Sequence, residues 1–330
     1  MQNLLDPAIL FFVIGAFAGA IRSNLEIPPA ISRFLSLYLL MALGLKGGFA
    51  LSASGLTANV GWSLAAAVTL ALGIPWLGYA LLRRIVSGFD AAAIAATYGS
   101  VSAVTFVTAV QYLENHGIAY GGHMAAAMAL MESPAIIMAV IFANQLRHTP
   151  APAGMTASNN ASGKSLGSIG KVLHESFTDG AQLLLLGAMV VGLLTGESGK
   201  AAMQPFSGDL FKGMLSFFLL DMGLMAARNW PRVQGQSLGL MAYAVIAPMV
   251  HAALALALAL VLNLPVGDTA LLMVLAASAS YIAVPAVLRF ALPEAQPSLY
   301  FGLSLGVTFP LNILLGIPAY VHLAQAAVTP

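Results

Sequence analysis

The chain contains no cysteine, so it forms no disulfide and offers no thiol nucleophile or thiolate metal ligand. It is also poor in charge: Asp, Glu, Lys and Arg make up 8% of its 330 residues, against about 25% in a typical soluble domain. A formal net charge of +1 is too small to favour nucleic acid as a partner. Zinc-ligand spacing, a glycine-rich phosphate loop and a hydrolase nucleophile elbow are all missing from the sequence, which therefore gives no support for an enzyme.

What the chain has in abundance is apolar sequence, with 59% hydrophobic residues and a mean hydropathy of +0.89. The N-terminal MQNLLDPAIL lacks the basic region and cleavage site of a signal peptide, so we expect it to open the first span. Since a span needs about 20 mostly apolar residues, we expect an all-α polytopic membrane protein with about ten transmembrane helices. The expected spans cover residues 7–21, 34–52, 60–82, 91–113, 122–146, 176–194, 208–227, 236–262, 268–290 and 298–322.

A polar stretch rich in Gly, Ser and Pro, residues 147–172, divides these spans five and five. We therefore predict a first five-helix repeat at 1–146, a linker at 147–172 and a second repeat at 173–330. Sequence echoes support the repeat, among them LSLYLL at 35–40 and LSFFLL at 215–220. An odd number of spans per half makes the second copy enter the membrane inverted, which is the 5+5 inverted-repeat architecture of secondary transporters.

The distribution of Lys and Arg predicts the orientation. All but three of the 13 basic residues fall in alternate loops, and only Lys46, Lys200 and Lys212 fall in the others. The positive-inside rule then places the linker in the cytoplasm and both termini outside.

Two expected spans carry small and hydroxyl residues near their centres: ATYGSVSAVTF at 96–106 and AASASYIAVP at 276–285. Helix packing explains either stretch alone, but their matching places in an inverted repeat favour two crossing, centrally broken helices. Gly99 weakens a helix and Pro285 cannot donate to one. Breaks would present free N–H groups, which suit a small anion, and carbonyl and hydroxyl oxygens, which suit Na⁺.

Few charged or strongly polar residues lie inside the spans, and each requires a reason. Glu132 and Asp221 are candidates for binding or coupling Na⁺. The alternatives are a structural hydrogen bond for Glu132 and contact with the cytoplasmic side near Arg228 for Asp221. Thr308 and Asn312 add neutral oxygens or simply pack.

These motifs resemble the sodium-dependent bicarbonate transporter family of the cyanobacterial type, over nearly the whole chain. The segments that carry the resemblance are LDPAILFFVIG at 5–15, FLSLYLLMALGLKGG at 34–48, YGSVSAVTFVTA at 98–109, ALMESPAI at 129–136, FLLDMGL at 218–224, ASYIAVPA at 279–286 and LPEAQPSLYFGLSLGVTFPLNI at 292–313.

The resemblance implies a core domain and a gate domain, a homotrimer, and Na⁺-coupled symport of bicarbonate into the cell by alternating access across a bacterial plasma membrane. It implies no cofactor, with Na⁺ as the coupling ion, and a cytoplasmic regulator of the PII-like class known for some members. Mapping its motifs predicts that bicarbonate binds at Gly99, Ser100, Val101, Ser102, Ala103, Ser278, Ser280 and Tyr281. The predicted Na⁺ residues are Thr105, Glu132, Asp221, Thr308 and Asn312.

Three alternatives stay open from the residues themselves. The same fold could move another small anion with Na⁺, because bicarbonate rests on the resemblance alone. A sodium–proton exchanger is disfavoured, since neither 96–108 nor 276–288 contains an acidic residue. A channel, or a membrane sensor that transports little, is the third.

Overall fold

The computed structural model describes residues 6–55, 57–148 and 180–328, and within these ranges every regular element is a helix. The prediction of an all-helical protein is therefore confirmed. The helices of the first half are α1 (Pro7–Ala20), α2 (Pro29–Ser54), α3 (Ala58–Leu82), α4 (Gly88–Gly99), α5 (Ala103–Asn115) and α6 (Met124–His148). Those of the second half are α8 (Gly180–Met203), η2 (Gln204–Asp209), α9 (Phe211–Val233), α10 (Leu238–Val261), α11 (Val266–Ala277), α12 (Ala283–Ala291), α13 (Pro297–Leu303), η3 (Ser304–Thr308), α14 (Phe309–Leu311), η4 (Asn312–Gly316) and α15 (Ile317–Val328).

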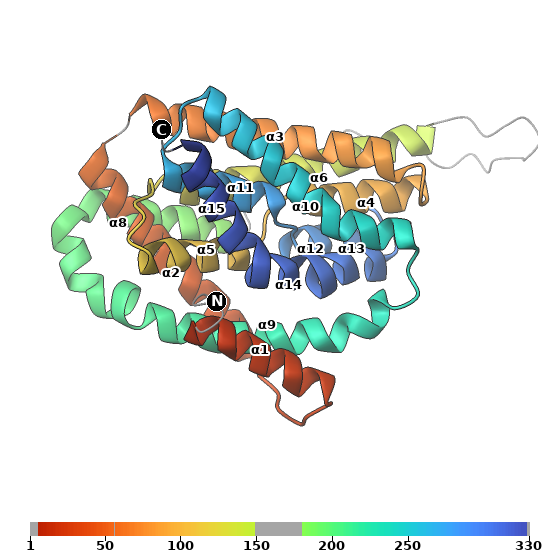
Figure 1. Ribbon diagram of the computed structural model, residues 1–330, viewed down its shortest axis with the longest axis horizontal. Coiled ribbons are helices and arrows are strands. Elements are labelled where there is room, and N and C mark those ends of the chain that lie inside the picture. The colour runs from red at the N-terminus through yellow and green to blue at the C-terminus, as the bar shows by residue number, and fades with distance from the viewer. Residues whose placement is uncertain (1–5, 56, 149–179, 329–330) are drawn as a thin grey trace, which may run out of the picture.

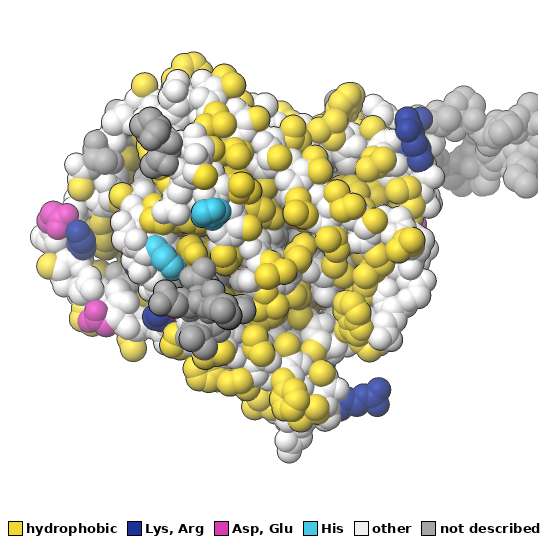
Figure 2. All heavy atoms as spheres, in the orientation of Figure 1, with side chains coloured by type: hydrophobic (Ala, Val, Ile, Leu, Met, Phe, Trp, Pro, Cys, Tyr) yellow, Lys and Arg dark blue, Asp and Glu magenta, His cyan; other side chains and the backbone are white. Residues whose placement is uncertain are grey.

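The surface has the character of a multi-pass membrane protein. On the face seen in Figure 2 most exposed side chains are hydrophobic, and the charged ones lie toward the left and right ends. Several helices, α3, α9 and α10 among them, run from one of these ends toward the other (Figure 1). A bilayer would therefore cover the apolar middle of the molecule and leave both charged ends in water.

Seven helical segments of the described chain are long and apolar enough to span a membrane, so the expected count of ten stays a prediction. The difference arises at three places. Gly180–Pro231 is one helical segment of 52 residues, although it reverses direction near Gly196, whose φ of 54° lies in the left-handed region. Pro7–Ala20 and Val266–Ala277 are each too short to span alone.

Four helices form a peripheral group: α1, α2, α8 and α9, which lie along the left and lower edges of Figure 1. Within it α2 packs against α8, and α1 packs against α9. Glycines allow the close approach. A Cβ atom on Gly48 would lie 2.1 Å from the carbonyl oxygen of Met189, and one on Gly223 would lie 2.1 Å from that of Phe12. Small residues at such contacts are how membrane helices pack without a hydrophobic driving force.

The remaining helices, α3 to α6 and α10 to α15, form the central group. Here α3 packs against α4 and α6, α10 packs against α11, and α11 packs against α15. The helices α4 and α11 are buried along almost their whole length, so the central group surrounds them on all sides.

Two helices of the central group are interrupted where the sequence indicates breaks. Helix α4 ends at Gly99 and α5 begins at Ala103, while α11 ends at Ala277 and α12 begins at Ala283. The interrupted segments contact each other directly. The Ser280 N–H donates to the carbonyl oxygen of Thr97 over 2.8 Å, and the Ser102 N–H donates to Ser278 Oγ over 3.0 Å. We call residues 100–102 the first break and residues 278–282 the second break.

The last expected span is also irregular. Wider π-helical turns occupy Ser304–Thr308 and Asn312–Gly316, on either side of Pro310. Proline lacks the N–H that an α-helix requires, and π-helical turns accommodate such a defect. The predicted linker falls outside the described residues except for Arg147 and His148, which belong to the last turn of α6.

Candidate ion-binding site

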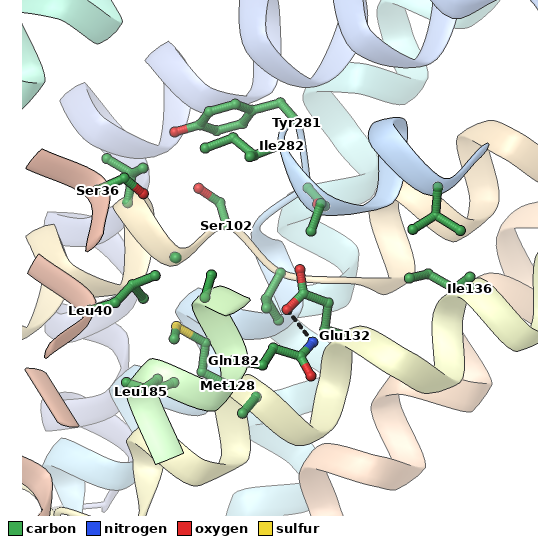
Figure 3. A pocket seen from close by; sticks show the side chains of 18 residues that line it. Ser36, Leu40, Ser102, Met128, Glu132, Ile136, Gln182, Leu185, Tyr281 and Ile282 are labelled. Carbon is green, nitrogen blue, oxygen red and sulfur yellow. Dashed lines mark hydrogen bonds between the residues drawn. The ribbon is translucent and has the colours of Figure 1, made fainter. Parts of the chain in front are cut away.

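A cavity of about 220 Å³ lies where the two breaks meet (Figure 3). The breaks and the first turns that follow them supply residues 101–104 and 280–283 of its lining. Helix α2 contributes Ser36, α6 contributes Glu132, and α8 contributes Gln182. At about 30 Å³ per water molecule, a cavity of this size holds a small ion with part of its hydration shell.

The N-termini of α5 and α12, the helices that follow the two breaks, face this cavity. Ser102 Oγ accepts the Thr105 N–H over 3.2 Å and so caps α5, while Ser280 Oγ accepts the Val284 N–H over 3.2 Å and caps the first turn of α12. In the part of the chain that the structure describes, the N–H of Ala103, also in the lining, donates to no protein acceptor. Unsatisfied N–H groups and the positive ends of two helix dipoles make this a favourable place for an anion.

Glu132 brings a carboxyl group to the same cavity. Its Oε2 atom accepts a hydrogen bond of 2.6 Å from Nε2 of Gln182, so the contact joins α6 to α8 (Figure 3). Neither Gln182 nor Ser36 belongs to the site residues expected from the sequence. Gln182 is the one polar side chain in AQLLLLGAMVVGLL, and a lone polar residue in such a run needs a buried partner, a signal that could have identified it.

The predicted bicarbonate residues fall into two groups, those that line the cavity and those that do not. Five of them line the cavity: Val101, Ser102, Ala103, Ser280 and Tyr281. The other three do not line it. Gly99 packs against the ring of Pro75, Ser278 Oγ accepts the Ser102 N–H, and Ser100 Oγ is buried without a hydrogen-bond partner among the described residues.

The predicted Na⁺ residues lie in separate hydrogen-bonded groups. Thr105 Oγ1 donates to Ser102 Oγ over 2.9 Å. Thr308 Oγ1 lies 2.7 Å from the Tyr98 hydroxyl oxygen and 2.8 Å from the carbonyl oxygen of Ala244. The Thr105 hydroxyl therefore lies on α5, just after the first break, and the Thr308 hydroxyl contacts α4, just before it.

Asn312 and Asp221 each have their own partners. Asn312 Nδ2 donates over 2.8 Å to the carbonyl oxygen of Ala277, the last residue of α11. Asp221 accepts a hydrogen bond from the Ser32 hydroxyl, within the peripheral group. No group of three or more His, Cys, Asp or Glu side chains occurs in residues 6–55, 57–148 and 180–328. The Na⁺ ligand set therefore stays a prediction.

Together these features define a multi-pass helical membrane protein that holds an ion-sized cavity between two interrupted helices. The chain belongs to the Na⁺-dependent bicarbonate transporter superfamily, whose family model matches residues 7–325. This confirms the resemblance recognised in the sequence, and membership of a transporter family agrees with the prediction that the chain is not an enzyme. No curated protein gave a significant match.

Proposed function

We propose that this protein couples the entry of Na⁺ to the uptake of bicarbonate, as a symporter that works by alternating access. Family membership gives the two transported ions. The observation that carries the proposal is the cavity in which the N-termini of α5 and α12 converge beside both breaks. A secondary transporter is expected to bind its substrate at such paired helix breaks near the middle of the membrane.

Bicarbonate binds in this cavity through backbone N–H groups and capping hydroxyls. Ser102 and Ser280 fix the first turns of α5 and α12, so the N–H groups are held in place before the anion arrives. Preorganised donors avoid the cost of ordering the site on binding. Gly99, through its contact with Pro75, and Ser278, through its bond to the Ser102 N–H, keep the two breaks in register. Ser100 adds a buried hydroxyl group to the first break.

Na⁺ is the coupling ion, and we assign it to oxygen atoms beside the breaks. Support comes from Thr308, which contacts Tyr98 of α4, and from Asn312, which contacts the C-terminal carbonyl of α11. Thr105, next to the Ser102 cap, completes the neutral oxygens of the predicted set. A bound cation there adds positive charge near the anion cavity, so each ion raises the affinity for the other.

We propose that residues 1–146 and 173–330 are the two inverted repeats, with ten spans in all. The support is a correspondence of contacts: α1 packs against α9 as α8 packs against α2, and α3 packs against α4 as α10 packs against α11. In this scheme the peripheral group is the gate domain and the central group is the core domain. Movement of one domain against the other then exposes the cavity to alternate sides.

The proposed orientation places both termini outside a bacterial plasma membrane. In its favour, Lys46, Lys200 and Lys212, the three basic residues predicted to be outside, line one cavity of about 550 Å³. A homotrimer and a PII-like cytoplasmic regulator are proposed from the family resemblance. The linker 147–172 that such a regulator could contact lies almost entirely outside the described residues.

The test is uptake of labelled bicarbonate into proteoliposomes that contain the purified protein. We expect saturable uptake that requires an inward Na⁺ gradient and disappears when K⁺ replaces Na⁺. Competition by other small anions identifies the substrate. If the protein takes up another anion in preference to bicarbonate, that anion is the substrate. An uptake rate that is the same with and without the Na⁺ gradient would contradict symport and favour a channel.

A further inference from the structure

The cavity combines features that do not suit the same simple anion. Two helix N-termini attract negative charge, yet Glu132 presents a carboxyl group to the same space. Among the described residues that line the cavity, Glu132 is the only one with a carboxyl group, and none is basic. An anion that carries no hydrogen would meet repulsion from this group and could donate no hydrogen bond to it.

Bicarbonate differs from other small planar anions in one relevant respect. At neutral pH it keeps an O–H group, so it is a monoanion that also donates a hydrogen bond. Nitrate has the same trigonal shape and the same charge but carries no hydrogen. A carboxylate accepts hydrogen bonds only, and hydrogen bonds to charged acceptors are the stronger kind. A carboxylate beside a set of N–H donors therefore matches the hydroxyl of bicarbonate and rejects nitrate.

The structure also shows what orients this carboxylate. Gln182 Nε2 donates to Glu132 Oε2 over 2.6 Å, and the second oxygen of Glu132 points away from Gln182 toward the breaks (Figure 3). A carboxylate has about four lone-pair positions, so it can accept hydrogen bonds from several donors at once. Because Gln182 lies on α8 and Glu132 on α6, the contact fixes the carboxylate from the neighbouring helix.

We infer that Glu132 is the acceptor for the hydroxyl group of the transported anion and that Gln182 is its positioning residue. The site thereby selects a hydrogen-bond-donating monoanion over an isosteric anion without a proton. This inference rests on the proposed function and replaces the role of Glu132 as a Na⁺ ligand. It adds Gln182, which no motif indicated, to the residues that determine specificity.

The experiment measures how well nitrate competes with bicarbonate, at saturating Na⁺, in proteoliposomes. For the wild type we expect nitrate to compete weakly. In Glu132→Gln the side chain keeps its length, but its amide can present an N–H as readily as an oxygen. We expect the preference for bicarbonate over nitrate to fall at least about tenfold, since sites built for a substrate hydroxyl lose discrimination when the acceptor is lost.

Gln182→Leu tests the positioning role, because it removes the donor that orients the carboxylate but keeps the Glu132 side chain itself. We expect a smaller loss of the same preference. Leu183→Met is the matched control: Leu183 follows Gln182 on α8, but its side chain is exposed and does not line the cavity. Its anion preference should equal that of the wild type.

Two results would overturn the inference. One is an unchanged nitrate preference in Glu132→Gln together with a shifted Na⁺ activation curve at saturating bicarbonate, which would return Glu132 to the Na⁺ site. The other is a Gln182→Leu variant whose preference for bicarbonate over nitrate equals that of Leu183→Met. For a variant that binds but does not transport, thermal stabilisation by bicarbonate and by nitrate gives the same comparison. Failure of the wild type to transport would refute the proposed function alone, because this binding comparison needs no transport.

Discussion

The contact between Gly99 and Pro75 permits a sharp test of how the first break is held. Gly99 is the last residue of α4, and a Cβ atom added there would lie 2.0 Å from Cγ and 2.5 Å from Cδ of Pro75. Carbon atoms normally approach no closer than about 3.5 Å, so Gly99→Ala must open the contact by about 1.5 Å. The proline ring is rigid, and the displacement therefore passes to the break.

The expected magnitude follows from two opposing effects. Overpacking a buried contact costs about 1–3 kcal/mol, while replacing glycine by alanine in a helix gains about 0.5–1 kcal/mol. We expect a net loss of up to about 2.5 kcal/mol in unfolding free energy. We expect a larger effect on uptake, of the order of 10- to 100-fold, because a shift of about 1 Å misaligns the capped N-termini.

The assay compares Gly99→Ala with Gly73→Ala in the same proteoliposome preparation. Gly73 lies on α3 two residues before Pro75, and a Cβ atom there would meet no atom within 4 Å. Its substitution should leave uptake near the wild type and should not lower the melting temperature, since the change itself gains about 0.5–1 kcal/mol in a helix. If Gly99→Ala transports as well as Gly73→Ala, the break is not held by this contact and the reasoning is wrong.

Three further predictions concern the supports of the site. Ser102→Ala combined with Ser280→Ala removes both caps, at about 1 kcal/mol each, and should abolish most uptake, whereas the Ser→Thr pair should retain it. Asn312→Leu leaves the last carbonyl of α11 unsatisfied and should lower stability by about 1–3 kcal/mol, measured by thermal melting; an unchanged melting point would contradict this. The hydrogen bond from Arg147 holds the pKa of Glu294 below its usual range, so the ion pair stabilises the fold at neutral pH and this stabilisation is lost as the pH falls through that pKa. Arg147→Ala should therefore lower the melting temperature at pH 7 but not at about pH 3, and an equal loss at both pH values would refute the prediction.

Much of the architecture could be predicted because the membrane restricts what a chain can do. Every backbone group in hydrocarbon needs a partner, so long apolar segments must be helices, and small polar residues amid such a segment mark a defect. The interruptions at 100–102 and 278–282 were visible for this reason. The helix count was harder, since α8 and α9 join through helical turns and hydropathy does not show where a helix reverses.

The lining of the cavity was only partly predictable. Ser102 and Ser280 lie on the breaks themselves, so the prediction of the breaks also predicted these two lining residues. Ser36 and Gln182 come from helices that are distant in sequence, and nothing in their own segments states which partner they meet. Asp221 was found as a carboxyl group inside a span, but its contact with the hydroxyl of Ser32 was not, and its role toward Na⁺ stays a prediction.

The hydrogen bonds between the two breaks have a consequence for how the protein is made. The carbonyl of Thr97 is satisfied by Ser280, and the N–H of Ser102 by Ser278, so each half of the chain supplies what the other lacks. When the first five helices leave the ribosome, residues 278–280 have not yet been synthesised. The first break must then wait in the membrane with polar groups exposed, at several kcal/mol for each group that finds no temporary partner. We therefore expect that a half-length chain is inserted but degraded, and that co-expression of the two halves as separate polypeptides rescues both.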